Sequence, residues 1–151
     1  MTVPTLSAAA LARETAISVA INCTLTAVFY FLLFQGVEKV PIWGLGKYAF
    51  DFLPQTFMVA LMGAMAPGLI ALRTLRLAKP TRAQIIRRAL AFACIAVIVG
   101  CSMVTAGLWL SGMETILFEY GLAAKLAYGG LLAAIVTPLF LHVQFSKRNY
   151  E

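Results

Sequence analysis

The sequence predicts an all-α integral membrane protein, built as a bundle of four transmembrane helices. Four apolar stretches contain no Lys, Arg, Asp or Glu: 15–34, 56–72, 89–110 and 126–143. A helix needs about 20 apolar residues to cross the hydrocarbon core of a bilayer. Charged residues make up 12% of the chain, whereas soluble domains carry about 25%. Both observations place most of the chain inside a membrane.

The connections between the stretches are too short to hold a separate soluble domain, so we expect residues 1–151 to form a single transmembrane domain. The first apolar stretch is 20 residues long and no Ala-x-Ala site follows it. The apolar core of a cleavable signal peptide is shorter, at about 7–15 residues. We therefore expect the first stretch to remain as a helix.

Basic residues are distributed unequally between the two sides of the predicted bundle. Nine fall on one side, six of them in the segment 73–88, and three fall on the other side, at Lys39, Lys47 and Lys125. Lys and Arg accumulate in cytoplasmic loops of membrane proteins. We therefore expect both termini and the 73–88 loop to face the cytoplasm, with the protein in a bacterial cytoplasmic membrane.

The same basic loop predicts a contact with lipid. Clusters of four to eight basic residues beside a transmembrane helix attract anionic headgroups, by about 1 kcal/mol each. The expected contacts are Arg73, Arg76, Arg82, Arg87 and Arg88. Because the basic residues gather at the ends of the stretches, where topology requires them, the net charge of +6 does not indicate a nucleic-acid partner.

Helix boundaries are predicted by two Ser/Thr-x-x-Gln/Glu patterns. Thr81 and Gln84 have the spacing of a capping box and follow Pro80, so the third helix should begin near residue 82. Ser111 and Glu114 repeat the pattern. They predict a short outer interfacial helix over 112–120, ended by Gly121.

Two prolines lie inside apolar stretches. Pro67 and Pro138 each remove a backbone hydrogen bond and should kink the second and fourth helices. Each lies in the cytoplasmic half of the second helix of a hairpin. The sequence therefore leaves open a duplication of two helical hairpins.

Small residues recur four positions apart on three of the stretches, in patterns that include Gly68, Gly100 and Gly130. Small side chains let helix backbones approach closely in lipid. We expect them to pack the four helices against one another. A homodimer surface is the alternative.

Polar residues lie near mid-membrane depth in the first and third stretches. Asn22 needs a hydrogen-bond partner because lipid offers none, and Ser102 and Thr105 lie at a comparable depth. We expect Asn22 to bond across the first and third helices and to fix their rotation. The alternative is that these residues line a polar path for a solute.

The stretches contain no Ser–His, Cys–His or paired-carboxylate arrangement, so we expect neither enzymatic activity nor catalytic residues. His142 is the single histidine, and the three cysteines lie inside stretches without a Cys-x-x-Cys pair. We expect no metal and no cofactor, because Met and Cys are ordinary packing residues in apolar cores.

Two functions remain open. The first is a non-enzymatic accessory or assembly subunit that acts by packing its helices against itself or against a membrane partner. The alternative is a small transporter or channel for a neutral or hydrophobic solute. The first predicts a bundle without internal water, and the second predicts a polar cavity between Asn22 and Ser102.

The charge distribution makes a testable prediction of topology. Reporter fusions after residues 40, 80, 116 and 151 should report outside, cytoplasm, outside and cytoplasm. A periplasmic signal from the fusion after residue 80 would contradict the topology, since the most basic segment would then have been translocated.

Overall fold

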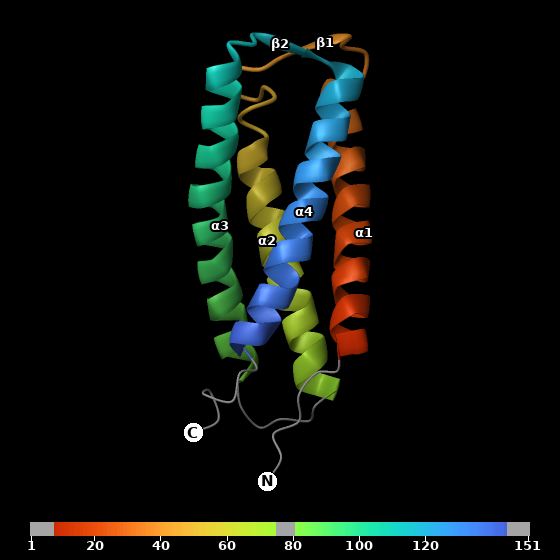
Figure 1. The fold of residues 1–151 in the computed structure, drawn as a ribbon, viewed down its shortest axis with the longest axis vertical. Helices are drawn as coiled ribbons and strands as arrows, with labels where there is room; N and C mark the ends of the chain where they lie inside the picture. Colours follow the sequence, from red (N-terminus) through yellow and green to blue (C-terminus); the bar gives the residue numbers. More distant parts are fainter. Residues whose placement is uncertain (1–7, 75–80, 145–151) are drawn as a thin grey trace.

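The computed structural model describes residues 8–74 and 81–144, which form four long helices and a small two-stranded sheet (Figure 1). In chain order the elements are α1 Ala8–Phe34, β1 Lys39–Pro41, α2 Phe52–Thr74, α3 Arg82–Ser111, β2 Thr115–Leu117 and α4 Phe118–Gln144. Each described helix is long and apolar enough to cross a membrane. The prediction of four such helices is therefore confirmed.

The sheet closes one end of the bundle, which we call the strand end; the far end is where α1 and α3 begin and α2 and α4 finish (Figure 1). β1 and β2 pair antiparallel, with Val40 opposite Ile116. Two further backbone bonds extend the pairing, from Ile42 N to Glu114 O at 2.9 Å and from Phe118 N to Glu38 O at 3.0 Å. The two connections at this end are thus joined to each other.

The predicted short helix over 112–120 is wrong. Gly112 ends α3 in a left-handed conformation, with a φ of 64°. Its backbone N–H donates a hydrogen bond to Trp109 O. The Ser111 hydroxyl accepts from Met113 N without starting a helix. Residues 115–117 pair with β1 instead, and α4 begins directly afterwards, so Gly121 lies in the first turn of a long helix. Strand pairing with a distant segment overrode the local capping pattern.

The other cap was predicted correctly. Thr81 Oγ1 accepts from Gln84 N at 3.3 Å, and Gln84 Oε1 accepts from Thr81 N at 2.9 Å. α3 begins at the next residue, Arg82. This reciprocal bonding satisfies backbone groups that the first turn of a helix leaves without intrahelical partners.

α2 and α4 form the centre of the bundle, and the other two helices flank them. α4 crosses in front of α2 in Figure 1, with α1 beside α4 and α3 beside α2. The two helices of each half, α1 with α2 and α3 with α4, contact each other much less. The predicted hairpins are therefore interleaved: each half packs mainly on the other half.

The two halves share one arrangement, helix–strand–helix. Gly36, with a φ of 81°, and Gly112, with a φ of 64°, each lie three residues before a strand. The antiparallel strand pair relates the halves about an axis between them. The duplication of two hairpins stays a prediction.

The small residues of the predicted packing stripes face neighbouring helices. A Cβ built on Gly68 would lie 2.9 Å from Phe140 Cε1, and one on Gly100 would meet the Tyr128 hydroxyl. On Gly130 it would lie 3.3 Å from Cys23 Sγ. These contacts favour packing within the chain over a homodimer surface. Pro67 and Pro138 lie inside the continuous helices α2 and α4, and the size of the kink there stays a prediction.

Two tyrosines hold the first turn of α4 in place. Tyr30 donates from its hydroxyl to Phe118 O at 3.1 Å, and Tyr48 donates to Gly121 O at 3.0 Å. Burial, with the nearby Tyr30 and Asp51, raises the pKa of the Tyr48 phenol, so that its hydroxyl keeps the proton it donates. A Cβ on Gly121 would meet the Tyr30 hydroxyl and lie 3.1 Å from Tyr48 Cε2.

We expect Gly121→Ala to lower the free energy of unfolding by about 1–3 kcal/mol, because the methyl group would displace both tyrosines from their bonds. Gly107→Ala is the matched control. A Cβ on Gly107 in α3 would meet no atom within 4 Å, so this change should stabilise the helix by up to about 1 kcal/mol. Unfolding in mild detergent compares the two variants. Equal stabilities would contradict the close packing at Gly121.

Candidate functional site

The covered face of α1 is polar along most of its length. Every fourth residue from position 14 to position 30 is polar and buried: Glu14, Ser18, Asn22, Thr26 and Tyr30. Hydrogen bonds join this row to α2 and α4 in three places, one of which is the bond from Tyr30 to Phe118 O. The other two are clusters of polar side chains. We call them the Gly63 cluster, made of Ser18, Asn22, Gly63 and Thr137, and the Lys125 cluster, made of Thr26, Asp51, Gln55 and Lys125.

The Gly63 cluster links three helices near the middle of the bundle. The Thr137 hydroxyl of α4 donates to Gly63 O of α2 at 2.9 Å and lies 3.0 Å from Ser18 Oγ of α1. Asn22 Nδ2 donates to Ser18 O at 2.8 Å and lies 3.4 Å from Ser18 Oγ. The three polar side chains are each less than a tenth exposed, so they satisfy one another without bulk water.

Two residues of α2 make the Gly63 cluster possible. Pro67 has no N–H to donate to the carbonyl four residues earlier, which is that of Gly63. Gly63 has no side chain, and a Cβ there would lie 3.3 Å from Thr137 Oγ1 and 3.4 Å from Ser18 Oγ. The proline therefore frees a carbonyl, and the glycine lets hydroxyls from two other helices approach it.

The predicted bond between Asn22 and Ser102 or Thr105 is wrong. Asn22 is 3% exposed and bonds within α1, whereas Ser102 and Thr105 are exposed on α3. α1 packs mainly on α4, and α3 packs mainly on α2, so the two flanking helices do not meet extensively. A similar predicted depth in the membrane therefore does not mean that these residues contact each other.

The Lys125 cluster lies nearer the strand end. Lys125 Nζ donates to Asp51 Oδ2 at 2.6 Å and to Gln55 Oε1 at 3.3 Å. The other end of the Gln55 amide, Nε2, donates to Thr26 Oγ1 and to Lys125 O, each at 3.2 Å. One glutamine thus joins α2 to both α1 and α4.

Lys125 is a buried charge with two hydrogen-bond acceptors and two aromatic neighbours. Its side chain is 1% exposed, and that of Asp51 is 16% exposed. The ammonium also lies 4.1 Å from the centre of the Phe52 ring and 5.0 Å from that of Tyr48. A buried ion pair is tolerated when its geometry is good and further hydrogen bonds satisfy both partners. Aromatic faces add a favourable interaction with the cation.

Sequence reasoning missed the burial of Lys125. It placed this residue in an outer loop, because it immediately precedes the fourth apolar stretch. α4 begins at Phe118, so Lys125 lies well inside the helix. Asp51 and Gln55, four residues apart at the start of α2, were the available signal, since this spacing points two polar groups to one side of a helix.

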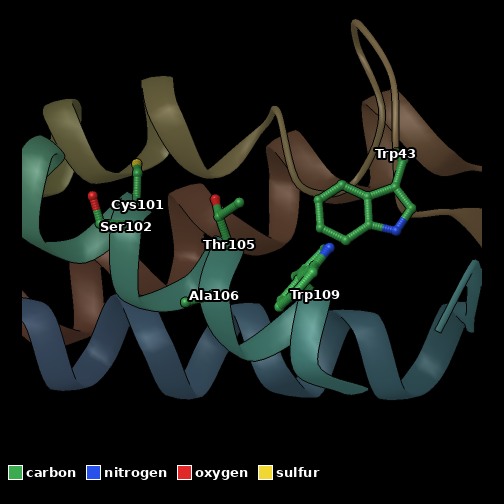
Figure 2. A pocket seen from close by; sticks show the side chains of 6 residues that line it. All are labelled: Trp43, Cys101, Ser102, Thr105, Ala106 and Trp109. Carbon is green, nitrogen blue, oxygen red and sulfur yellow. The ribbon is translucent and has the colours of Figure 1, made fainter. Parts of the chain in front are cut away.

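A groove lies on the outward side of α3 near the strand end (Figure 2). Its volume is about 530 Å³, and its lining residues are Trp43, Cys101, Ser102, Thr105, Ala106 and Trp109. The Trp43 indole N–H donates to Met113 O at 3.2 Å. Figure 2 shows the two indole rings at one end of the groove and the Ser102 and Thr105 hydroxyls along α3.

The Ser102 and Thr105 hydroxyls differ from the other described Ser and Thr hydroxyls of the four helices. Neither forms a hydrogen bond within 8–74 and 81–144. The remaining Ser and Thr side chains described within the four helices are all bonded: Thr15, Ser18, Thr24, Thr26, Thr56, Ser111 and Thr137. The groove therefore presents two polar groups that this part of the chain leaves without a partner.

Four of the basic residues predicted to contact anionic lipid lie near the far end. Arg73, Arg82 and Arg87 are exposed. Arg88 is half-buried and donates to Gln144 Oε1 at 3.0 Å, which ties the start of α3 to the end of α4. Arg76 lies outside the described residues.

Among the described residues, no group of three or more His, Cys, Asp or Glu side chains could hold a metal ion. Cys23, Cys94 and Cys101 are free thiols. Cys101 lines the groove and lies 3.7 Å from Thr56 Oγ1, which is 2.7 Å from the Tyr128 hydroxyl. The thiol therefore packs within a hydrogen-bonded group.

Comparison with known proteins gives no relative from which a function could be transferred. The chain matches no protein-family model, no curated protein and no solved structure. The two buried clusters and the groove are therefore the features of the molecule that indicate a function.

We expect Lys125→Met to lower the free energy of unfolding by about 2–4 kcal/mol, because Asp51 and Gln55 would lose their shared donor. Lys47→Met is the control: this exposed lysine should change stability by no more than about 0.5 kcal/mol. Adding Asp51→Leu to Lys125→Met should restore part of the loss. If Lys125→Met were as stable as Lys47→Met, the ion pair would not hold the strand end together.

Proposed function

We propose that the protein is a non-enzymatic accessory or assembly subunit that packs α3 against a transmembrane helix outside this chain. It lies in a bacterial cytoplasmic membrane, with the far end in the cytoplasm and the basic residues of that end on anionic headgroups. The observation that carries the proposal is the pair of unbonded hydroxyls, Ser102 and Thr105, beside the groove on α3.

Inside a membrane these hydroxyls need a partner. Lipid tails offer neither donors nor acceptors, and hydrogen bonds between Ser or Thr and a neighbouring helix contribute to helix association in lipid. α3 is also the least covered of the four described helices. A helix lying in the groove would both cover α3 and bond the two hydroxyls.

The outward face of α1 provides a comparison. Large apolar side chains, among them Leu25, Val28 and Leu32, are exposed there, as suits a helix that faces lipid. Its exposed hydroxyl, Thr24, bonds to the carbonyl of Ala20 in its own helix at 2.9 Å. α1 therefore has the character of a lipid-facing helix. α3 also exposes large apolar side chains, among them Ile98 and Met103, but it adds two hydroxyls that form no hydrogen bond within the described residues.

Charge indicates the kind of helix that fits. Arg87 is exposed on α3 and lies 18 residues before Thr105, which is about five helical turns, so both lie on the same side of the helix. We therefore expect a partner helix with an acidic residue near its cytoplasmic end and a hydrogen-bonding side chain at the depth of Ser102.

The alternative function, passage of a neutral or hydrophobic solute, needs a cavity that joins Asn22 to Ser102. The groove that Ser102 lines does not include Asn22, which is 3% exposed and bonds within α1. We therefore favour helix packing.

Photo-crosslinking in the native membrane tests the proposal. A photoreactive residue at Ile98, two turns from Thr105 and 68% exposed, should give a protein adduct of one defined mass. The same residue at Val28 on α1 should give none. Ser102→Leu with Thr105→Leu should reduce the Ile98 adduct about fivefold to tenfold, because each interhelical bond contributes about 0.6 kcal/mol.

The controls separate the possible outcomes. Thr24→Leu should leave the adduct unchanged, because this hydroxyl faces away from α3. An adduct with twice the mass of the chain would identify a second copy as the partner. Adducts with lipid alone, or an Ile98 adduct that persists without the two hydroxyls, would contradict the proposal.

A further inference from the structure

We propose that the Gly63 cluster is a binding site for a dehydrated monovalent cation such as Na⁺. This inference is independent of the proposed packing of α3, since the cluster lies on the opposite side of α2, between α1 and α4. It rests on the oxygen atoms that three helices bring together, on the balance of donors and acceptors among them, and on a buried carboxylate nearby.

Oxygen atoms from three helices converge at the cluster. Ser18 Oγ comes from α1, the Gly63 carbonyl from α2 and Thr137 Oγ1 from α4, with separations of 2.9–3.0 Å between bonded pairs. Hard cations are bound by hydroxyl, carbonyl and amide oxygens. Carbonyls released from a regular helix coordinate ions in many membrane transporters, and Pro67 releases the carbonyl of Gly63.

Acceptors outnumber donors in the cluster. Each hydroxyl supplies one hydrogen. The Asn22 amide lies closer to the Ser18 backbone carbonyl than to the Ser18 hydroxyl, so its hydrogen goes mainly to the carbonyl. Asn22 Oδ1 receives no hydrogen bond from the described residues. The fully buried side-chain oxygens of the cluster each have a hydrogen-bond partner among the described residues, and their remaining lone pairs are available to a cation.

A buried carboxylate lies one helical turn from the cluster. Glu14 is four residues before Ser18 on the same covered face and is 9% exposed. Its ion-pair partner is Arg13, whose side chain is 72% exposed and therefore largely in solvent. The negative charge of Glu14 offsets part of the cost of placing a cation among neutral oxygens.

The ligand set favours a monovalent ion. Ca²⁺ and Mg²⁺ sites use carboxylates as direct ligands, whereas the oxygens of the Gly63 cluster are all neutral. One carboxylate a turn away matches one positive charge. The far end, where Glu14 meets exposed Arg13, is the nearest route of entry.

Thermal unfolding of the purified full-length chain in mild detergent tests the site, with NaCl, KCl and choline chloride compared at equal concentration. Near-saturating Na⁺ should raise the Tm by about 3–8 °C over choline, because an ion that binds the folded state alone stabilises it. Choline is too large to enter the cluster and controls for ionic strength. Equal Tm values in NaCl, KCl and choline chloride would overturn the proposal.

Substitutions locate the effect. Thr137→Val keeps the shape of the side chain but removes its oxygen, and it should abolish the salt-specific rise in Tm. Thr24→Val makes the same change on the outward face of α1 and should retain the full rise. Ser18→Ala provides a second variant if Thr137→Val fails to fold. A rise that persists in both cluster variants would place the cation elsewhere and overturn the proposal; an equal rise in Na⁺ and K⁺ that both variants lose would support an unselective site.

Discussion

The carbonyl that Pro67 leaves without a helical donor determines which helices meet in this bundle. An unbonded carbonyl in an apolar environment costs several kcal/mol, so a donor from another helix has to reach Gly63. Thr137 supplies it at 2.9 Å, and the missing side chain at Gly63 lets α4 come close enough. α2 and α4 are therefore the central pair, with α1 and α3 on either side of them.

The same requirement organises the strand end. Lys125 would be prohibitively costly inside a helix bundle without partners, and its partners, Asp51 and Gln55, come from the start of α2. Tyr30 and Tyr48, which belong to other segments of the chain, donate hydrogen bonds to carbonyls in the first turn of α4. The connection between β1 and α2 therefore contributes to the core itself and cannot be treated as a loop that only joins two helices.

What the sequence predicts correctly is local, and what it misses is pairing between distant segments. Apolar stretches predict the four helices, and the Thr81–Gln84 spacing predicts the start of α3, because both depend on neighbouring residues. The strand pair replaces the expected helix over 112–120, because β1 competes for the backbone groups of residues 115–117. Asn22 was matched with Ser102 by depth alone, which cannot tell which flanking helix borders which central one.

The site divides in the same way. The freed carbonyl of Gly63 follows from the position of Pro67, but its partner Thr137 lies 74 residues away. Periodicity does show that positions 14, 18, 22, 26 and 30 share one face of α1. That this face is covered, with its polar groups buried, depends on how α4 crosses it. The burial of charged side chains is therefore the feature that is hardest to predict from a single sequence, although it carries the largest energetic cost.

The flanking helices α1 and α3 occupy corresponding positions in the two halves, yet α1 buries hydroxyl groups that α3 exposes. α1 turns Ser18 and Thr26 toward the core and presents large apolar side chains outward. α3 buries small apolar residues such as Ala89 and Ala93 and turns Ser102 and Thr105 outward. If the halves arose by duplication, they have since diverged, so that α1 supplies polar groups to the interior and α3 carries two hydroxyls on a largely apolar outward face. Two hydroxyls without a hydrogen bond gain no partner from lipid, and this difference is the physical reason to look for the proposed partner helix at α3 and for the proposed ion beside α1.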